Sequence, residues 1–320
     1  MSSSEPSPFD EWSCQQVPVE HGTIFLRYAG TGQPVLLLHG VPQHSLMFHS
    51  IAPALVSKGF LVIVPDLPGM GQSFHRNSAA PLTSKNASDA LYTMIKFLRI
   101  SQMHIFSFDK GCGPAVLLAR DHPDLVKSLI VAEYALPGFG LESFQQPSKD
   151  KTLADSWHLG LFTVPEAAVF LIKGREEQFL AWYFWHASYS GLSAIKLDHF
   201  QRYVQQWQRP GGLEAAVEFL NGSVWADMEE FKSVRIKPRM LAMGSEGSVP
   251  TRELLEQFWG SIGEKGLECV VVPKCGHWLG DENPLWVANY ISYWINKSEG
   301  EASVVNLEWL GEKFTLNEGA

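Results

Sequence analysis

The sequence is poor in cysteine and has no long apolar run. Only four cysteines occur among 320 residues: Cys14, Cys112, Cys269 and Cys275. They are too few and too scattered for a disulfide framework or a cysteine-based zinc site, so we expect free thiols and no metal. No stretch approaches the ~18 apolar residues of a membrane span, and the first residues lack the apolar core of a secretory signal. We therefore expect a soluble, cytoplasmic protein without a membrane partner.

An excess of basic charge is also missing. The chain has 25 lysines and arginines against 34 acidic residues, a net charge of −9. Nucleic acids and anionic membrane surfaces are polyanions, so we expect neither as a partner. With 45% hydrophobic residues the chain can instead bury one large core, which argues against disorder.

Apolar runs alternate with helical patterns over the first third of the chain. Runs rich in Val, Ile and Leu predict buried strands at 35–38, 61–64, 104–106 and 129–132. The helical patterns between them cover 51–57, 87–99 and 114–121. Continuously apolar strands separated by helices are typical of an α/β fold, with a mostly parallel sheet covered by helices on both faces.

The alternation stops after Pro137. A helical and strongly aromatic stretch follows, and strands return only at 239–243 and 268–272, before a last helix at 284–296. An interrupted α/β pattern predicts a cap inserted over the carboxyl ends of the strands, where open α/β sheets bind ligands. The expected division is a core of 1–137 and 226–296, a helical cap of 138–225 and a tail of 297–320. The tail packs onto the core or against a second subunit of a homodimer, and the sequence leaves both open.

The main chemical signal lies at the end of the third predicted strand. Ser107, Asp109 and Gly111 form a small-x-acid-x-small pattern between a strand and a helix. This pattern is typical of a nucleophile elbow, a strained turn that exposes a reactive side chain and requires small neighbours two residues away. The alternative is that Asp109 is an ordinary helix N-cap. We favour the nucleophile, and expect the helix N-terminus to favour its anionic form.

Two further motifs complete a catalytic pattern. The turn His39-Gly40-Val41 follows the first core strand, and there the backbone N–H of Val41, together with that of Lys110, is placed to form an oxyanion hole. His39 itself is interpreted as a structural hydrogen-bonding residue. His277 follows the last strand, in the position of a general base.

The acid that orients His277 is less clearly marked. Glu133 ends the strand after the elbow, and Glu246 follows the next strand. We favour Glu133 and keep Glu246 as the alternative; either carboxylate could instead be part of a strand-end salt bridge.

An aspartate at the elbow changes the reaction. A carboxylate that attacks a saturated carbon forms an alkyl ester, whereas a serine would form an ether that water cannot release. Water activated by His277 can then cleave the ester at the aspartyl carbonyl carbon. Asp109 therefore favours epoxide opening or carbon–halogen hydrolysis, with no cofactor required.

At these residues the chain resembles the epoxide hydrolase and haloacetate dehalogenase branch of the α/β-hydrolase superfamily, in particular soluble epoxide hydrolases. The resemblance runs from about residue 22 to 294. Other segments that carry it are Asp66-Leu67-Pro68-Gly69-Met70-Gly71-Gln72-Ser73, 132–138, 157–158, 174–176, Tyr203 and 208–212. It implies the α/β-hydrolase fold with a cap, and in haloacetate dehalogenases the acid also follows the strand after the elbow, as Glu133 does.

The cap departs from the pattern of the epoxide hydrolases. These enzymes usually protonate the epoxide oxygen with two cap tyrosines, whose places fall near Trp157-His158 and near Phe219-Leu220. The cap residues considered for substrate contact are Trp157, His158, Tyr183 and Tyr189, the last three as proton donors; the alternative for each is hydrophobic packing.

The residues that bind halide or carboxylate in the dehalogenases are also missing. Lys110 stands in the place of the tryptophan that haloalkane dehalogenases carry after the nucleophile, and Lys110, Gly113 and Leu159 replace the haloacetate dehalogenase residues. Lysine is a point charge and cannot replace a paired arginine fork. The preferred function is hydrolysis of an epoxide on an apolar small molecule. The alternatives are dehalogenation of a haloacid or haloalkane, and a hydrolase-like binding protein without turnover.

Overall fold

A single sheet of nine strands organises the part of the chain that the structure describes. The structure is a computed structural model and describes residues 8–76, 80–146, 156–249, 251–297 and 304–310. The strands are Ser13–Val19 (β1), Gly22–Ala29 (β2), Gln33–Leu38 (β3), Phe60–Pro65 (β4), Phe74–His75 (β5), Met103–Phe108 (β6), Val126–Ala132 (β7), Arg239–Ser245 (β8) and Leu267–Val272 (β9). Their order is β1-β2-β4-β3-β6-β7-β8-β9, and β5 pairs with β2.

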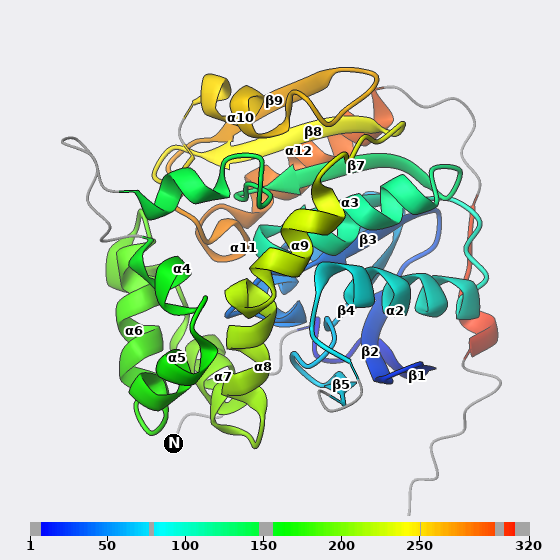
Figure 1. The fold of residues 1–320 in the computed structure, drawn as a ribbon. Helices are drawn as coiled ribbons and strands as arrows, with labels where there is room; N and C mark the ends of the chain where they lie inside the picture. Colours follow the sequence, from blue (N-terminus) through cyan, green and yellow to red (C-terminus); the bar gives the residue numbers. More distant parts are fainter. Residues whose placement is uncertain (1–7, 77–79, 147–155, 250, 298–303, 311–320) are drawn as a thin grey trace, which may run out of the picture.

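The sheet is parallel from β4 to β9, as the apolar runs predicted. Every pair from β4–β3 to β8–β9 is parallel, and only the pairs that involve β2 are antiparallel. All residues of β4 and β6 are buried, because helices cover both faces. These helices are Ile51–Val56 (α1), Ser84–Phe97 (α2), Cys112–Asp121 (α3), Arg252–Trp259 (α10) and Pro284–Asn296 (α12). Helices α2 and α3 pack together on one face, and α1 and α12 on the other (Figure 1).

Helices fill the long connection between β7 and β8. They are Trp157–Leu161 (α4), Pro165–Ile172 (α5), Glu176–His186 (α6), Leu197–Gln208 (α7), Gly212–Val217 (α8) and Val224–Phe231 (α9), with a π-helical turn at Glu218–Gly222 (η5). We call residues 138–225 the cap segment; its residues 147–155 lie outside the described ranges. Helices α4 to α8 lie beside one end of the sheet, and α9 leads back to it across the boundary expected at residue 225 (Figure 1). The division into core and cap stays a prediction.

The described part of the tail contacts the core. Gly32 and Val305 form an antiparallel bridge through hydrogen bonds of 3.2 and 3.0 Å between their backbone groups. Leu307 and Leu310 are buried, and the guanidinium of Arg99 lies 4.8 Å from the ring centroid of Trp309. The sequence left open whether the tail packs onto the core or against a second subunit. Residues 304–310 pack onto the core of their own chain.

Two further observations concern the cysteines and the helices. All four cysteines are free thiols, and only Cys14 is exposed. Within the described ranges, none of the helices combines the length and the apolarity that crossing a membrane demands.

Candidate active site

The turn after β6 has the strained geometry of a nucleophile elbow. Asp109 begins a short 3₁₀ turn, Asp109–Gly111 (η2), and its φ of +48° lies in the left-handed region that non-glycine residues rarely adopt. A Cβ at Gly111 would lie 2.4 Å from the carbonyl oxygen of His39, so that position admits only glycine. The N-cap of α3 is Gly111, and therefore the alternative that Asp109 is an N-cap is wrong.

The loop after β3 holds the carboxylate of Asp109. Its Oδ1 accepts a hydrogen bond of 2.8 Å from the backbone N–H of Val41, and the backbone N–H of Lys110 also donates to the carboxylate. A Cβ at Gly40 would lie only 2.4 Å from Oδ1, so this close approach requires glycine. His39 uses both ring nitrogens on the backbone, accepting from Leu67 N at 2.9 Å and contacting the oxygen of Gly40 at 2.8 Å. Its role is structural, as interpreted from the sequence.

The pKa of Asp109 is raised, whereas the helix N-terminus was expected to favour its anionic form. Burial raises the pKa of its carboxyl, and the opposing effects of His277 and of the two backbone N–H groups are too weak to cancel this. The expected preference for the anion at the helix N-terminus is thus outweighed, because the side chain is almost fully removed from water.

His277 lies between two carboxylates. Its Nδ1 is 3.1 Å from Oε2 of Glu133, and its Nε2 is 3.8 Å from Oδ2 of Asp109. Burial lowers the pKa of His277, but the hydrogen bond that the ring donates to Glu133 and the charges of both carboxylates outweigh burial, so the net pKa is raised. Glu246 instead accepts a hydrogen bond of 2.7 Å from the backbone N–H of Lys274. The geometry therefore places Glu133, and not Glu246, beside the histidine.

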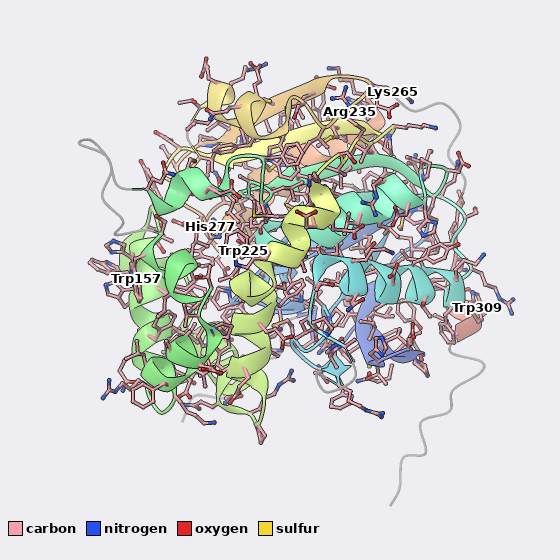
Figure 2. The ribbon with its side chains drawn as sticks, viewed as in Figure 1. Trp157, Trp225, Arg235, Lys265, His277 and Trp309 are labelled. Atoms are coloured by element: carbon pink, nitrogen blue, oxygen red, sulfur yellow. The ribbon has the colours of Figure 1, made fainter. Side chains whose placement is uncertain are left out.

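Backbone hydrogen bonds tie the loop of His277 to the cap segment. The N–H of His277 donates to the carbonyl of Ala187 at 2.9 Å, and the indole N–H of Trp278 donates to the carbonyl of Phe184 at 2.8 Å. His277 accordingly lies where the sheet meets the cap segment (Figure 2). His277 is thus positioned by both parts of the chain.

Two of the four cap candidates form a buried pair near these residues. Nε2 of His158 and the hydroxyl of Tyr183 are 3.0 Å apart. Burial, and secondarily the charge of His277, lowers the pKa of His158 to about 3, so this imidazole is neutral. Burial raises the pKa of Tyr183 well above its ordinary value, with a contribution from the charge of Asp109. Trp157 and Tyr189 are 37% and 52% exposed, and Trp157 lies at the outer edge of the cap segment (Figure 2).

A buried ion pair next to Asp109 was not predicted. The ammonium of Lys110 lies 2.5 Å from Oδ2 of Asp227, on α9, and both side chains are 1% exposed. Ser84 donates to the same carboxylate through its backbone N–H at 2.9 Å and its hydroxyl at 2.8 Å. Asp227 follows Lys110 by 117 residues, and nothing in the local sequence marks either partner. The side chain of Lys110 therefore points into the α2–α9 packing.

Comparison with known proteins agrees with this geometry. The family described as the alpha/beta hydrolase fold matches residues 33–284. The soluble epoxide hydrolase of Corynebacterium sp. strain C12 is 25% identical over 265 residues, which cover 81% of this chain and 88% of that protein. The fluoroacetate dehalogenase of a Burkholderia species is 25% identical over 214 residues, covering 65% and 68%.

A solved structure shows the same fold. Wild-type Cfl2 from Burkholderia cenocepacia superposes with a TM-score of 0.80 at 21% identity, covering 88% of this chain and 95% of that one. At this identity the likeness concerns the fold alone. The family match spans most of the sheet and the whole cap segment, and the chain therefore belongs to the alpha/beta hydrolase family, with homologues among the epoxide hydrolases and dehalogenases.

Proposed function

We propose that this hydrolase opens an epoxide on an apolar small molecule through a covalent ester on Asp109. The observation that carries the proposal is a carboxylate, in place of a hydroxyl, at the strained elbow, with a histidine–glutamate pair beside it. A carboxylate that attacks carbon leaves an ester that water can cleave, so the residue type selects displacement at saturated carbon.

In the first step, Oδ2 of Asp109 attacks an epoxide carbon. Oδ1 accepts the hydrogen bond from Val41, so Oδ2 is the oxygen that faces His277 and is free to react. The new bond joins Oδ2 to the substrate carbon, the epoxide carbon–oxygen bond breaks, and its electron pair goes to the epoxide oxygen. That oxygen then takes a proton.

The proton donor in this proposal is Tyr183, supported by His158. Their 3.0 Å contact links the tyrosine hydroxyl to a neutral imidazole, and the charge of Asp109 acts on the pKa of Tyr183, as expected of neighbours. A tyrosine with a raised pKa keeps its proton until a strongly basic alkoxide forms. Tyr189 is half-exposed and less suited to a site that excludes water.

In the second step, His277 removes a proton from water, which attacks Cγ of Asp109. Oδ1 becomes the oxyanion, which the N–H of Val41 already contacts, and the N–H of Lys110 acts on the same carboxyl group. Esterification also removes the Asp109 charge that raises the pKa of His277, so a larger fraction of this imidazole is in the neutral form that can accept a proton from water. Collapse of the intermediate expels the product as an alkoxide, which takes the proton held by His277 and leaves as the diol. The carboxyl of Asp109 then returns the second proton of the water to the phenolate of Tyr183, which regenerates the carboxylate and the proton donor.

Dehalogenation fits these residues less well. Lys110 stands where haloalkane dehalogenases carry a tryptophan, and its ammonium is directed to Asp227. Halide stabilisation by that side chain would require breaking a buried ion pair.

Trapping of the intermediate tests the proposal. The His277→Gln variant should form the ester and fail to hydrolyse it, so the peptide containing Asp109 should gain the mass of the epoxide. Asp109→Asn should gain no mass and turn nothing over. Adding Tyr183→Phe to His277→Gln should slow ester formation, while Tyr189→Phe, the matched control on the exposed tyrosine, should leave it unchanged.

The alternatives give different results in the same assay. Halide release from haloalkanes or haloacids, with adducts only from those substrates, would identify a dehalogenase. Tight epoxide binding without an adduct in the His277→Gln variant, and without turnover in the wild type, would identify a binding protein. Normal turnover by the His277→Gln variant would refute the two-step mechanism.

A further inference from the structure

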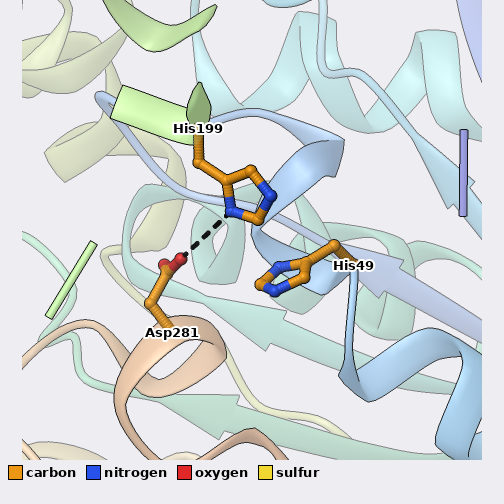
Figure 3. Close-up of side chains that lie close together, drawn as sticks. All are labelled: His49, His199 and Asp281. Atoms are coloured by element: carbon orange, nitrogen blue, oxygen red, sulfur yellow. Dashed lines mark ion pairs between the residues drawn. The ribbon is translucent and has the colours of Figure 1, made fainter. Parts of the chain in front are cut away.

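A second cluster of histidine and carboxylate side chains lies at the junction of the cap segment and the core. It consists of His49, which follows the 3₁₀ turn Ser45–Phe48 (η1), His199 on α7, and Asp281 on the short helix Leu279–Glu282 (α11). The two imidazole rings and the carboxylate point toward one another (Figure 3). One potential ligand atom from each residue lies within 4.8 Å of the other two, and Nδ1 of His199 is 3.8 Å from Oδ1 of Asp281.

One buried atom on each side chain of this cluster has no partner at normal hydrogen-bond distance in the part of the chain that the structure describes, although the atoms of His199 and Asp281 form an ion pair at 3.8 Å. Among the described residues, none hydrogen-bonds to Nδ1 of His49, Nδ1 of His199 or Oδ1 of Asp281. His49 is 9% exposed, and the side chains of His199 and Asp281 are 4% and 2% exposed. Buried polar atoms are rarely left without a hydrogen bond, and three in one cluster are consistent with a shared partner. A cation that accepts all three lone pairs would supply it.

The neighbouring residues support ligand roles for the cluster. Gln43 donates from Nε2 to Oδ2 of Asp281 at 2.8 Å, which leaves Oδ1 of that carboxylate for the cation. Asp198 lies 3.7 Å from Nε2 of His199, on the ring nitrogen opposite the facing one. Outer carboxylate and amide contacts of this kind orient metal ligands in known sites. Oε1 of Gln43 is a further buried acceptor without a partner in the described ranges.

The donor set selects the class of metal. Two imidazoles and one carboxylate suit zinc and its neighbours in the first transition row, whereas magnesium and calcium prefer oxygen ligands. Tetrahedral zinc with bonds of about 2.1 Å separates its ligands by roughly 3.4 Å. The three ligand atoms, which lie within 4.8 Å of one another, therefore have to approach by up to about 1.4 Å when the metal binds. The ammonium of Lys196 is a nearby positive charge that would repel a bound cation. Lys196 is exposed, however, so solvent screens this repulsion.

We propose that His49, His199 and Asp281 bind one divalent cation of the zinc class, with water or Gln43 as a further ligand. The site joins α7 of the cap segment to two core elements, and Asp281 follows the proposed base His277 by only four residues. Its role is structural: the bound cation fixes the cap segment on the core beside the base. It takes no part in the proposed reaction, and its test does not depend on activity.

Metal titration of the full-length protein tests the site. The protein carries Cys14→Ser throughout, because the exposed thiol could bind zinc elsewhere. After chelator treatment, calorimetry should show one Zn²⁺ per chain, and Mg²⁺ should not bind. Free zinc at 100 times the Kd should raise the Tm by roughly 4 °C. His199→Gln and His49→Gln should each weaken zinc binding more than about 10-fold, whereas His21→Gln, on the turn between β1 and β2, should bind as before.

A second measurement uses the protein with both histidines intact, so it remains informative if the histidine variants fail to fold. X-ray absorption at the zinc edge should report two imidazole ligands and no sulfur. Absence of stoichiometric zinc binding, a ligand set that contains sulfur or fewer than two imidazoles, or unchanged affinity in both histidine variants would each overturn the proposal.

Discussion

The buried ion pair of Lys110 and Asp227 gives an asymmetric prediction for stability. Asp227→Leu leaves the ammonium of Lys110 without its carboxylate at 1% exposure, with the ring of Phe219 5.6 Å away as its remaining contact. Breaking one side of a buried pair typically costs about 3–5 kcal/mol. With about 2.1 cal/mol/K of unfolding entropy per residue, this corresponds to a Tm lower by roughly 4–8 °C.

The reverse change should be milder. Lys110→Met leaves Asp227 with both hydrogen bonds from Ser84, the first residue of α2, where the helix dipole favours a negative charge. We expect a loss of about 1–3 kcal/mol, as for one unsatisfied buried group. The double variant should be more stable than Asp227→Leu alone, because it buries no unpaired charge.

Denaturant unfolding of the four proteins measures this cycle. The matched control is the exposed pair of Lys173 and Glu214, 3.0 Å apart, where Lys173→Met should change stability by less than about 1 kcal/mol. Equal losses for Lys110→Met and Asp227→Leu, or a double variant as unstable as the sum of both, would refute the reasoning.

Three further predictions concern the site itself. Glu133→Gln should lower kcat by about 1,000- to 10,000-fold, by analogy with loss of the triad acid in serine proteases, whereas Glu246→Gln should leave steady-state kinetics unchanged. Gly40→Ala would place a methyl group 2.4 Å from Oδ1 of Asp109 and should reduce kcat/KM by about 100-fold; native circular dichroism with full activity would contradict this. Because burial raises the pKa of Asp109, kcat/KM should fall on acidification at a higher pH than for an ordinary aspartate, and the rate of ester hydrolysis should rise as His277 loses its proton. A pH profile of each step checks both directions.

The interior of the sheet was predictable because its strands are buried on both faces. Such strands have few polar positions, and runs like 61–64 stand out in the sequence. The hairpin of β1 and β2 was not predicted. In β1, Ser13–Val19, only Val17 is buried, so this edge strand carries too little apolar pattern to be recognised.

In the candidate site, too, some residues were predicted from the sequence and some contacts were not. Asp109 and His277 were found through local motifs, in which the neighbouring residues report on the geometry of one turn. The choice between Glu133 and Glu246 depends on which strand end faces the histidine, and that is a property of the assembled sheet. The pairing of His158 with Tyr183 likewise joins two helices of the cap segment, so neither sequence neighbourhood contains it.

The fate of one oxygen atom tests the central claim most directly. Enzyme in excess over an epoxide substrate completes a single turnover in water enriched in heavy oxygen, and both the diol and the peptide containing Asp109 are weighed. The covalent mechanism predicts one heavy oxygen in the carboxyl of Asp109 and none in the diol, because the diol takes its new oxygen from Oδ2. Label in the diol after that first turnover, with none in Asp109, would contradict the mechanism.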